Sequence, residues 1–378
     1  MKITNIFLLV TDITLDGGVE RVVCNMANSF AERNYNVVII SMFSANQSLN
    51  YQFRKNIKIE IIKGGIGRVT WMNKHTSRIN LIRRYQTSVH FTRLIYAIID
   101  QYSKGGKSVL LTNSYLYATP LYRHRNVHII GLDHSRYPFG NMTGGIRHWL
   151  HTYMIRKFDV VTTLNEDELD KWKSIGPPVY IMPNFLPQNW INNNASTSKR
   201  NKVIVSMGRM NTNQKGFDRL IEAYSLIAAK HPDWKLNIYG SGCLQKEYRQ
   251  LINDLNMQDF IEIFDFTKNP LAVYQTASIY AMCSREEGFP MVLLEAGCQG
   301  LPIISYDIQF GPRTLINDTV TGYIIPDGNK EKFAESLEKL MNDDNLREKM
   351  SENIRKDIPA RFSEEVIIDK WIKIINSI

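Results

Sequence analysis

Short apolar runs alternate with longer amphipathic stretches along most of the chain. In the first half, several of these runs hold consecutive Val, Ile or Leu residues, which is typical of strands buried on both faces. They predict strands at 5–10, 37–42, 58–62, 108–112, 128–132, 160–164 and 179–182. Apolar residues recur at helical spacing over 18–33, 79–101 and 146–157, which predicts helices there.

The same alternation starts again in the second half. Strands are predicted at 202–208, 235–239, 260–264, 279–283, 302–305 and 322–325, and helices at 217–230, 244–255, 271–275, 291–298 and 330–342. Residues 184–201 are rich in Asn, Ser and Thr and are typical of a linker. Strands that alternate with helices predict parallel sheets, so the two series predict an α/β protein with two doubly wound domains, at 1–184 and 185–362.

The last segment, 363–378, has the pattern of an amphipathic helix. Val366, Ile367, Trp371, Ile374 and Ile375 lie at helical spacing. We expect this helix to pack back on the first domain, and the alternative is a terminal helix of the second domain.

Composition supports a globular protein. The chain has 378 residues, 44% of them hydrophobic and 22% charged, which suits two ordinary domains. The apolar run at 2–10 is followed by acidic residues and predicts a buried strand rather than a signal peptide. No apolar stretch reaches the roughly 20 residues that span a bilayer. The four cysteines form no Cys-x-x-Cys pair, which favours reduced thiols in a cytoplasmic protein.

Positive charge is concentrated in the first half. Residues 1–184 carry 23 Lys and Arg against 12 Asp and Glu, and 61–132 carry eleven basic residues and one acid. Aromatic and aliphatic residues, among them Trp71, Tyr85, Phe91 and Tyr96, lie between these cations. This pattern favours an anionic membrane surface as a partner of residues 61–132. No nucleic-acid-binding module is visible, and a solvated basic face is the alternative.

The segment 284–296 has the clearest chemical signal. Glu287 follows the strand at 279–283, and Glu295 lies in the helix that begins after Pro290. The intervening loop allows both carboxylates to reach one ligand, and the helix start offers free N–H groups to phosphate. Carboxylates for sugar hydroxyls beside amides for phosphate predict a nucleotide-sugar site. The alternatives are a surface acid at 287 and a buried, hydrogen-bonded acid at 295.

Two cations follow the first strand of the second half. Gly208-Arg209 ends this strand and Lys215-Gly216 follows after a polar loop. Ligands of α/β folds bind at this edge of the sheet, so the two side chains are candidates to neutralise a leaving diphosphate. The alternative is that both are solvated loop charges.

Weaker signals lie in the first half. Gly17-Gly18 follows the first strand and opens a helix, as glycines do where backbone approaches a ligand. His134 follows the strand at 128–132, where it can donate to a sugar hydroxyl or phosphate; a structural histidine is the alternative. No Asp-x-Asp sequence occurs, so we expect side-chain cations and helix dipoles, rather than a metal or other cofactor, to stabilise the leaving group.

Taken together, these residues resemble the retaining GT-B glycosyltransferases of glycosyltransferase family 4. The resemblance covers nearly the whole chain and rests on Gly17-Gly18, His134, Pro183-Asn184, Gly208-Arg209 with Lys215-Gly216, and 287–296. It implies two Rossmann-like domains that face a cleft, with the nucleotide sugar held mainly by the second domain. The loop Gly311-Pro312-Arg313-Thr314 departs from the family, which often has Gly-Pro-x-Glu. No role of that acid is carried over to this chain, and Arg313 places a cation in the loop instead.

The resemblance implies a role for each matching residue. Arg209 and Lys215 would hold the diphosphate, Glu287 the donor sugar and Glu295 the ribose. The implied catalytic residues are His134, Arg209, Lys215 and Glu287. The implied donor-binding residues are Gly17, Gly18, Arg209, Lys215, Phe266, Thr267, Glu287, Gly288, Phe289, Pro290, Met291 and Glu295, with Phe266 and Thr267 beside the base.

The function that the resemblance implies is sugar transfer with retained anomeric configuration. A hexose or N-acetylhexosamine would move from a nucleotide sugar, with UDP as the expected nucleotide, to a lipid-linked or surface-polysaccharide glycan at the inner face of the cell membrane. No protein nucleophile lies in the motifs, so the leaving diphosphate is expected to accept the acceptor's proton. The alternatives are a nucleotide-sugar epimerase or hydrolase and a catalytically silent nucleotide-sugar-binding protein.

Overall fold

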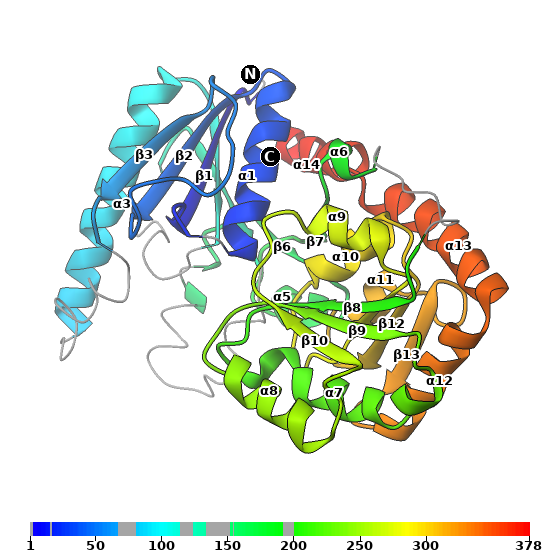
Figure 1. Cartoon of the computed structure of the whole chain (residues 1–378). Helices are drawn as coiled ribbons and strands as arrows, with labels where there is room; N and C mark the ends of the chain where they lie inside the picture. Colours follow the sequence, from blue (N-terminus) through cyan, green and yellow to red (C-terminus); the bar gives the residue numbers. More distant parts are fainter. Residues whose placement is uncertain are drawn as a thin grey trace. The chain divides into compact units, whose positions relative to one another are not determined.

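The computed structural model describes residues 3–15, 17–66, 81–113, 124–133, 152–153, 155–191 and 200–378. Backbone contacts divide the chain into two compact units (Figure 1). The first unit contains Met1–Phe185 and Glu364–Ile378, and the second contains Leu186–Ser363. Each unit is built on its own parallel sheet, so the prediction of two doubly wound α/β units is confirmed.

The first unit holds a seven-stranded sheet in the order β3-β2-β1-β4-β5-β6-β7. Neighbouring strands are all parallel; Leu8, for example, lies between Ile39 and Leu111. The chain moves from β1 to β2 in one direction and reaches β4 on the other side of β1, so the order reverses there. The strands are β1 (Asn5–Asp12), β2 (Asn36–Phe43), β3 (Lys58–Lys63), β4 (Ser108–Thr112), β5 (Val127–Leu132), β6 (Val160–Thr163) and β7 (Val179–Ile181).

Helices cover this sheet with their apolar faces. Helix α1 (Gly18–Glu32) buries Val23 and Phe30, and α3 (Leu81–Ser103) buries Phe91 and Ile95. Helix α14 (Glu364–Ser377), at the end of the chain, packs beside α1 in the first unit. Its buried Ile367, Trp371 and Ile375 recur every four residues, so they form one apolar face of the helix. The short helix α5 (Leu169–Lys173) completes the described helices of this unit.

The second unit holds a six-stranded parallel sheet in the order β10-β9-β8-β11-β12-β13. Here the order reverses between β8 and β11, which are adjacent and paired through Ile204 with Ile279. The strands are β8 (Val203–Met207), β9 (Lys235–Tyr239), β10 (Ile261–Phe264), β11 (Ile279–Met282), β12 (Ile303–Asp307) and β13 (Gly322–Pro326).

Two groups of helices cover the second sheet. One group consists of helices α7, α8 and α12, which pack together, and the other consists of α9, α10 and α13. Figure 1 shows α7 and α10 on opposite faces of the sheet. The elements are α6 (Gln188–Ile191), η2 (Asn213–Lys215), α7 (Phe217–Ser225), η3 (Ala228–Lys230), α8 (Gln245–Asp254), α9 (Pro270–Thr276), α10 (Met291–Cys298), α11 (Pro312–Leu315), α12 (Lys330–Asn342) and α13 (Asp344–Phe362).

The predicted helices differ from the structure in several places. The helix predicted at 217–230 stops at Ser225, and a 3-10 turn follows because Ile227 leaves the helical conformation and turns into the core. The sequence analysis missed α13, whose buried Met350, Ile354, Ile358 and Phe362 are separated by polar residues. The segment predicted as a linker, 184–201, contains the short helix α6. Most of the helix predicted at 146–157 lies outside the described residues.

Candidate functional site

The carboxyl ends of β8 and β11 define the candidate site. The two strands are neighbours, and the chain continues from β8 to one side of the sheet and from β11 to the other. In parallel α/β sheets, ligands bind beside the carboxyl ends of the strands at such a reversal. Residues 208–216 follow β8, and 283–290 follow β11. The structure therefore brings together two segments that the sequence analysis selected separately.

Lys215 and Glu287 meet at this point. Lys215 Nζ lies 2.7 Å from Glu287 Oε1, and Ser284 Oγ donates to the same carboxylate oxygen at 2.7 Å. The side chain of Glu287 is only 8% exposed, whereas that of Lys215 is 21% exposed. A cation that is partly open to solvent, beside a carboxylate held by two donors, is available to an anionic ligand.

Two glycines allow the loop after β8 to take this course. A Cβ atom on Gly208 would lie 2.8 Å from Lys215 Cγ, so the lysine stem crosses directly over this residue. Gly216 has φ +64°, and a Cβ atom there would lie 1.9 Å from the carbonyl oxygen of Cys283. Glycine at 208 leaves room for the lysine stem within this loop, and glycine at 216 permits the close approach of the loop to Cys283.

The segment after Glu287 is anchored on both sides. Pro290 precedes the first residue of α10, and a Cβ atom on Gly311, at φ +100°, would lie 2.5 Å from Pro290 Cδ. The ring of Phe289 packs edge-on against Phe362, with 5.8 Å between the ring centroids. Gly288 is half-buried, as is Met291. The backbone of this motif is thus held in place from neighbouring elements.

Glu295 lies deeper than the other predicted site residues. Its side chain is 2% exposed, and its Oε2 accepts a hydrogen bond of 3.1 Å from the hydroxyl of Tyr274, itself fully buried. This is the buried, hydrogen-bonded environment that the sequence analysis kept as an alternative. Its contact with a ribose stays a prediction.

The other candidates of the second unit lie after β8 and β10. Arg209 directly follows the carboxyl end of β8 and is exposed. Phe266 is 64% exposed, and its backbone N–H donates to Ser241 Oγ at 3.1 Å. Thr267 Oγ1 accepts from the N–H of Asn269. An exposed aromatic ring at the edge that also carries Arg209 is available for stacking.

In the first unit, Gly17 and Gly18 begin α1. The carbonyl of Gly17 accepts bonds from Arg21 N and Tyr51 Oη, and a Cβ atom there would lie 2.1 Å from Glu20 Oε2. Around Gly18, a Cβ atom would meet nothing within 4 Å. Glu20 Oε2 is the far end of a flexible side chain that can move aside, so local packing does not require glycine at position 17 or 18.

His134 lies outside the described residues, but the residue before it is well defined. Asp133 is 3% exposed, and its Oδ2 accepts a 2.8 Å hydrogen bond from Trp172 Nε1. The tryptophan lies 39 residues away in the sequence, so this contact has no local sequence signal.

The amphipathic part of residues 61–132 serves the core. Phe91, Ile95 and Tyr96 on α3 are buried in the hydrophobic core of the first unit. Trp71 and the side chain of Tyr85 lie outside the described part of the chain. The apolar side of this helix therefore packs in the core of its own unit, and contact of residues 61–132 with a membrane surface stays a prediction. The cations Arg93, Lys104 and Arg125 of residues 61–132 are exposed to solvent.

The loop that departs from the family carries an ion pair. Arg313 donates from Nε and Nη2 to the two carboxylate oxygens of Asp307, at 2.8 and 2.5 Å. The side chain of Arg313 is 72% exposed, and its positive charge is neutralised by the carboxylate of Asp307.

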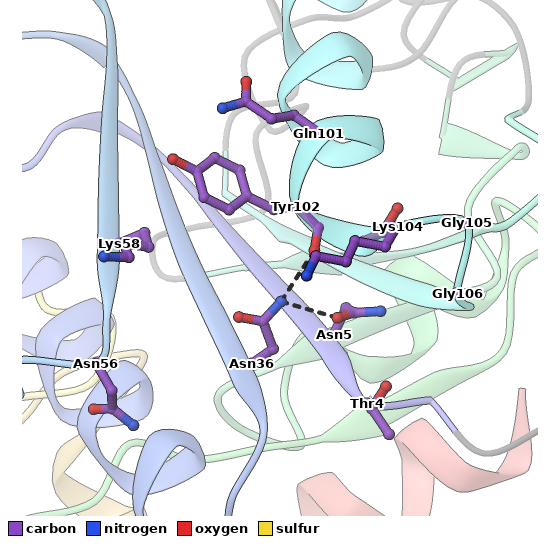
Figure 2. Close-up of a pocket in the computed structure, with 11 residues that line it drawn as sticks. Thr4, Asn5, Asn36, Asn56, Lys58, Gln101, Tyr102, Lys104, Gly105 and Gly106 are labelled. Carbon is purple, nitrogen blue, oxygen red and sulfur yellow. Dashed lines mark hydrogen bonds between the residues drawn. The ribbon is translucent and has the colours of Figure 1, made fainter.

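A hollow of about 670 Å³ lies in the first unit (Figure 2). Asn36 Nδ2 donates there to Asn5 Oδ1 at 3.0 Å and to the carbonyl of Tyr102 at 3.3 Å. The hollow is at the amino ends of β1, β2 and β3, the opposite edge from the one where parallel sheets bind ligands. It is lined by Thr4, Asn5, Asn36, Asn56, Lys58, Gln101, Tyr102, Ser103, Lys104, Gly105 and Gly106, and by none of the predicted site residues.

Among the residues that the structure describes, no three or more His, Cys, Asp and Glu side chains gather in a way that suits a metal ion. Within the same ranges, no helix is both long and apolar enough to cross a membrane.

The fold and the site define a class of protein. Two Rossmann-like units, each built on a parallel sheet, are the architecture of GT-B glycosyltransferases. Residues 16–188 match the family described as Glycosyltransferase Family 4, and residues 188–357 match Glycosyl transferases group 1. The chain therefore belongs to the glycosyltransferases.

Individual relatives agree with this assignment. An uncharacterized glycosyltransferase of Haemophilus influenzae is 28% identical over 98% of this chain and 99% of its own length. The amylovoran biosynthesis glycosyltransferase AmsD of Erwinia amylovora is 26% identical over 98% of this chain and 99% of its own length. For several other relatives, the matched part is between 20% and 50% of the relative's length.

A solved structure shares the fold over the full chain. It is a mutant of S. aureus TarM in complex with fondaparinux, alpha-GlcNAc-glycerol and UDP. The two folds superpose with a TM-score of 0.75 at 16% sequence identity and cover 99% of this chain and all of the other.

Proposed function

We propose that this glycosyltransferase moves a hexose or N-acetylhexosamine from a UDP-sugar to a glycan acceptor, with retention of anomeric configuration. The observation that carries the proposal is the contact of Lys215 with Glu287 at the strand reversal of the second sheet. It combines, within one short contact, a cation suited to a diphosphate and a carboxylate suited to sugar hydroxyls.

The proposed chemistry assigns one task to each side chain. Lys215 and the exposed Arg209 neutralise the charge that develops on the diphosphate as its bond to the anomeric carbon breaks. Glu287 accepts hydrogen bonds from donor-sugar hydroxyls and stabilises positive charge on the ring. The acceptor oxygen bonds to the anomeric carbon on the face that UDP leaves, and its proton passes to the departing diphosphate oxygen. The products are a glycoside and UDP.

Relatives support the donor and the acceptor class. The TarM structure contains UDP, and the relative CapM of Staphylococcus aureus is a capsular polysaccharide biosynthesis glycosyltransferase. We therefore infer UDP as the nucleotide, and a surface-polysaccharide glycan, free or carried on a lipid diphosphate, as the acceptor. Phe266 is the proposed platform for the uracil ring because an exposed aromatic side chain at the ligand-binding edge can stack on a base.

We also propose that the enzyme works in the cytoplasm while reversibly bound to the inner face of the cell membrane. The exposed cations Arg93, Lys104 and Arg125, with the basic excess of residues 61–132, support this proposal. Each basic residue near an anionic leaflet contributes about 1 kcal/mol of attraction. Co-sedimentation should rise with the phosphatidylserine content of vesicles and fall with salt. Equal sedimentation with neutral vesicles would contradict it.

The proposed reaction is tested first by donor and acceptor screening. A panel of UDP- and GDP-sugars should identify donors that raise the unfolding temperature, and those donors should then be consumed when glycan acceptors are added. Release of UDP and free sugar at the same rate without an acceptor would favour the hydrolase. Interconversion of sugars without release of UDP would favour the epimerase, and protection without turnover the silent binding protein.

A further inference from the structure

A second pair of charged residues joins the two loops of the candidate site. Arg285 Nη1 donates to Asp218 Oδ1 at 2.8 Å, and Nη2 donates to Oδ2 at 2.7 Å. The two residues are 67 positions apart in the sequence. Asp218 lies in the first turn of α7, directly after the loop that carries Lys215, and Arg285 lies between Ser284 and Glu286. The pair therefore links the loop after β8 to the loop after β11.

The same arginine holds the turn that precedes Lys215. Its Nη1 also donates to the carbonyl and to the side-chain oxygen of Asn213, at 3.0 and 2.9 Å. Its backbone N–H donates to the carbonyl of Gln214 at 2.8 Å, and Gln214 Nε2 donates to the carbonyl of Glu286 at 3.0 Å. Residues 213 and 214 are thus bound to residues 285 and 286, immediately before Lys215 and Glu287 respectively.

We propose that Arg285 and Asp218 are positioning residues for sugar transfer, because they fix the turn that places the Lys215 ammonium against Glu287. The inference rests on the proposed function and adds to it two residues that do not themselves contact the reacting groups. Lys215 has a flexible side chain, so the position of its charge depends on how its backbone is held. The five hydrogen bonds of the Arg285 backbone N–H and guanidinium supply that restraint.

The electrostatics of the pair agree with this arrangement. Burial opposes ionisation of Asp218, but the hydrogen bond and charge of Arg285 outweigh it, so the pKa of Asp218 lies below its ordinary value. The hydrogen bond to Asp218 raises the pKa of Arg285 despite partial desolvation. Both partners are therefore charged in the pH range where a glycosyltransferase works.

The expected losses of stability and of rate on removal of Arg285 separate a positioning role from a structural one. The side chains of Arg285 and Asp218 are 38% and 25% exposed, so their pair resembles a surface ion pair, whose loss changes the stability of a protein little. A displacement of a catalytic group by about 1 Å, by contrast, costs on the order of 100-fold in rate. Removal of the arginine should leave a folded protein whose turnover is strongly reduced.

The test uses the full chain with the variants R285Q, R285K and D218N. We expect kcat to fall on the order of 10- to 100-fold in R285Q, with the donor KM and the unfolding temperature close to wild type. R285K keeps the charge but not the planar fork, so it should not restore kcat. The double variant R285Q/D218N should lose no more than R285Q alone, because both act through one contact.

A matched control is available in the same unit. Arg347 also donates to an aspartate, Asp344, and to two backbone carbonyls, those of Leu340 and Met341, but it lies at the junction of α12 and α13. R347Q should retain wild-type kcat. If R347Q loses as much activity as R285Q, the effect is one of general stability, and the proposed role of Arg285 is wrong.

Two outcomes separate failure of this inference from failure of the proposed function. If the wild type transfers sugar and R285Q and D218N do so at the same kcat, the positioning role is refuted. If the wild type transfers no sugar, the proposed function fails, and hydrogen exchange still tests the pair. Backbone amides of 213–216 and 284–287 should exchange faster in R285Q than in wild type, and unchanged exchange there would refute the restraint. If R285Q does not fold, D218N and R285K serve for both measurements.

Discussion

Replacing Lys215 with methionine removes the ammonium from the candidate site and keeps a side chain of similar length. In the structure this charge lies 2.7 Å from Glu287 Oε1 and is 21% exposed. A diphosphate held beside the same ammonium places opposite unit charges about 4 Å apart, an attraction of about 4 kcal/mol at an effective dielectric constant near 20. If that attraction develops mainly as the leaving group departs, kcat should fall by about three orders of magnitude.

The cost of this substitution to the fold should be much smaller. Glu287 keeps its hydrogen bond from Ser284, and the partial exposure of Lys215 lessens the penalty for a carboxylate that has lost its cation. We expect a loss of about 1–2 kcal/mol, below the 3–5 kcal/mol typical of a broken buried pair. For a unit of this size, that corresponds to a fall of about 2–8 °C in the unfolding temperature.

Single-turnover kinetics and UDP titration calorimetry together test this prediction. K215M should bind UDP within about tenfold of wild type while its chemical step slows by about 1,000-fold. E287Q is the matched partner variant, because it leaves the ammonium in place. Equal losses in UDP affinity and in the chemical step would refute the reasoning, since Lys215 would then bind the ground state and the transition state alike.

Three further predictions follow from the same geometry. G216A should lower the unfolding temperature at least twice as much as the control G328A. Both glycines have positive φ, but only at position 216 would a Cβ atom lie 1.9 Å from a backbone oxygen. Equal losses in the two variants would show that the backbone at 216 relaxes easily. The lowered pKa of Asp218 means that its pair with Arg285 adds stability above the pKa of unfolded aspartate, near 3.9, and loses it as pH falls through the lower folded value. The difference in unfolding temperature between wild type and D218N should therefore shrink below about pH 4, and a constant difference from pH 3 to 6 would contradict this sign. Burial raises the pKa of Cys24 to about 11 and that of Cys298 to about 12, and it also raises the pKa of Cys283. Cys243, by contrast, is exposed. Ellman's reagent at pH 8 should therefore titrate one fast thiol in the native protein and four thiols after denaturation.

The strands could be predicted because each is a short apolar run that ends at polar or glycine residues. The predicted bounds of β4 and β9 match the structure, and other strands differ by one or two residues at an end. Helix α13 could not be predicted in the same way, because its buried residues recur only every four positions within a very polar sequence that also contains Pro359. The interruption after Ser225 depends on how Ile227 meets the core, which is a tertiary effect.

The candidate site could be predicted only in part. The cations after β8 and the carboxylate after β11 were predicted separately, each from its place after a strand, and the structure shows Lys215 in contact with Glu287. Arg285 and Asp218 were not found, because each is a charged loop or helix residue with no local signal and the pairing depends on the folded chain. The burial of α3 likewise depends on the sheet beneath it.

The most direct test of the central claim follows the transferred sugar itself. A UDP-sugar labelled with ¹³C at its anomeric carbon, incubated with enzyme and a glycan acceptor, should give glycoside and UDP in equal amounts in the NMR spectrum. The glycoside should keep the donor's anomeric configuration, and its formation should be nearly abolished in K215M. A product of inverted configuration, or one formed at an undiminished rate by K215M, would contradict the account.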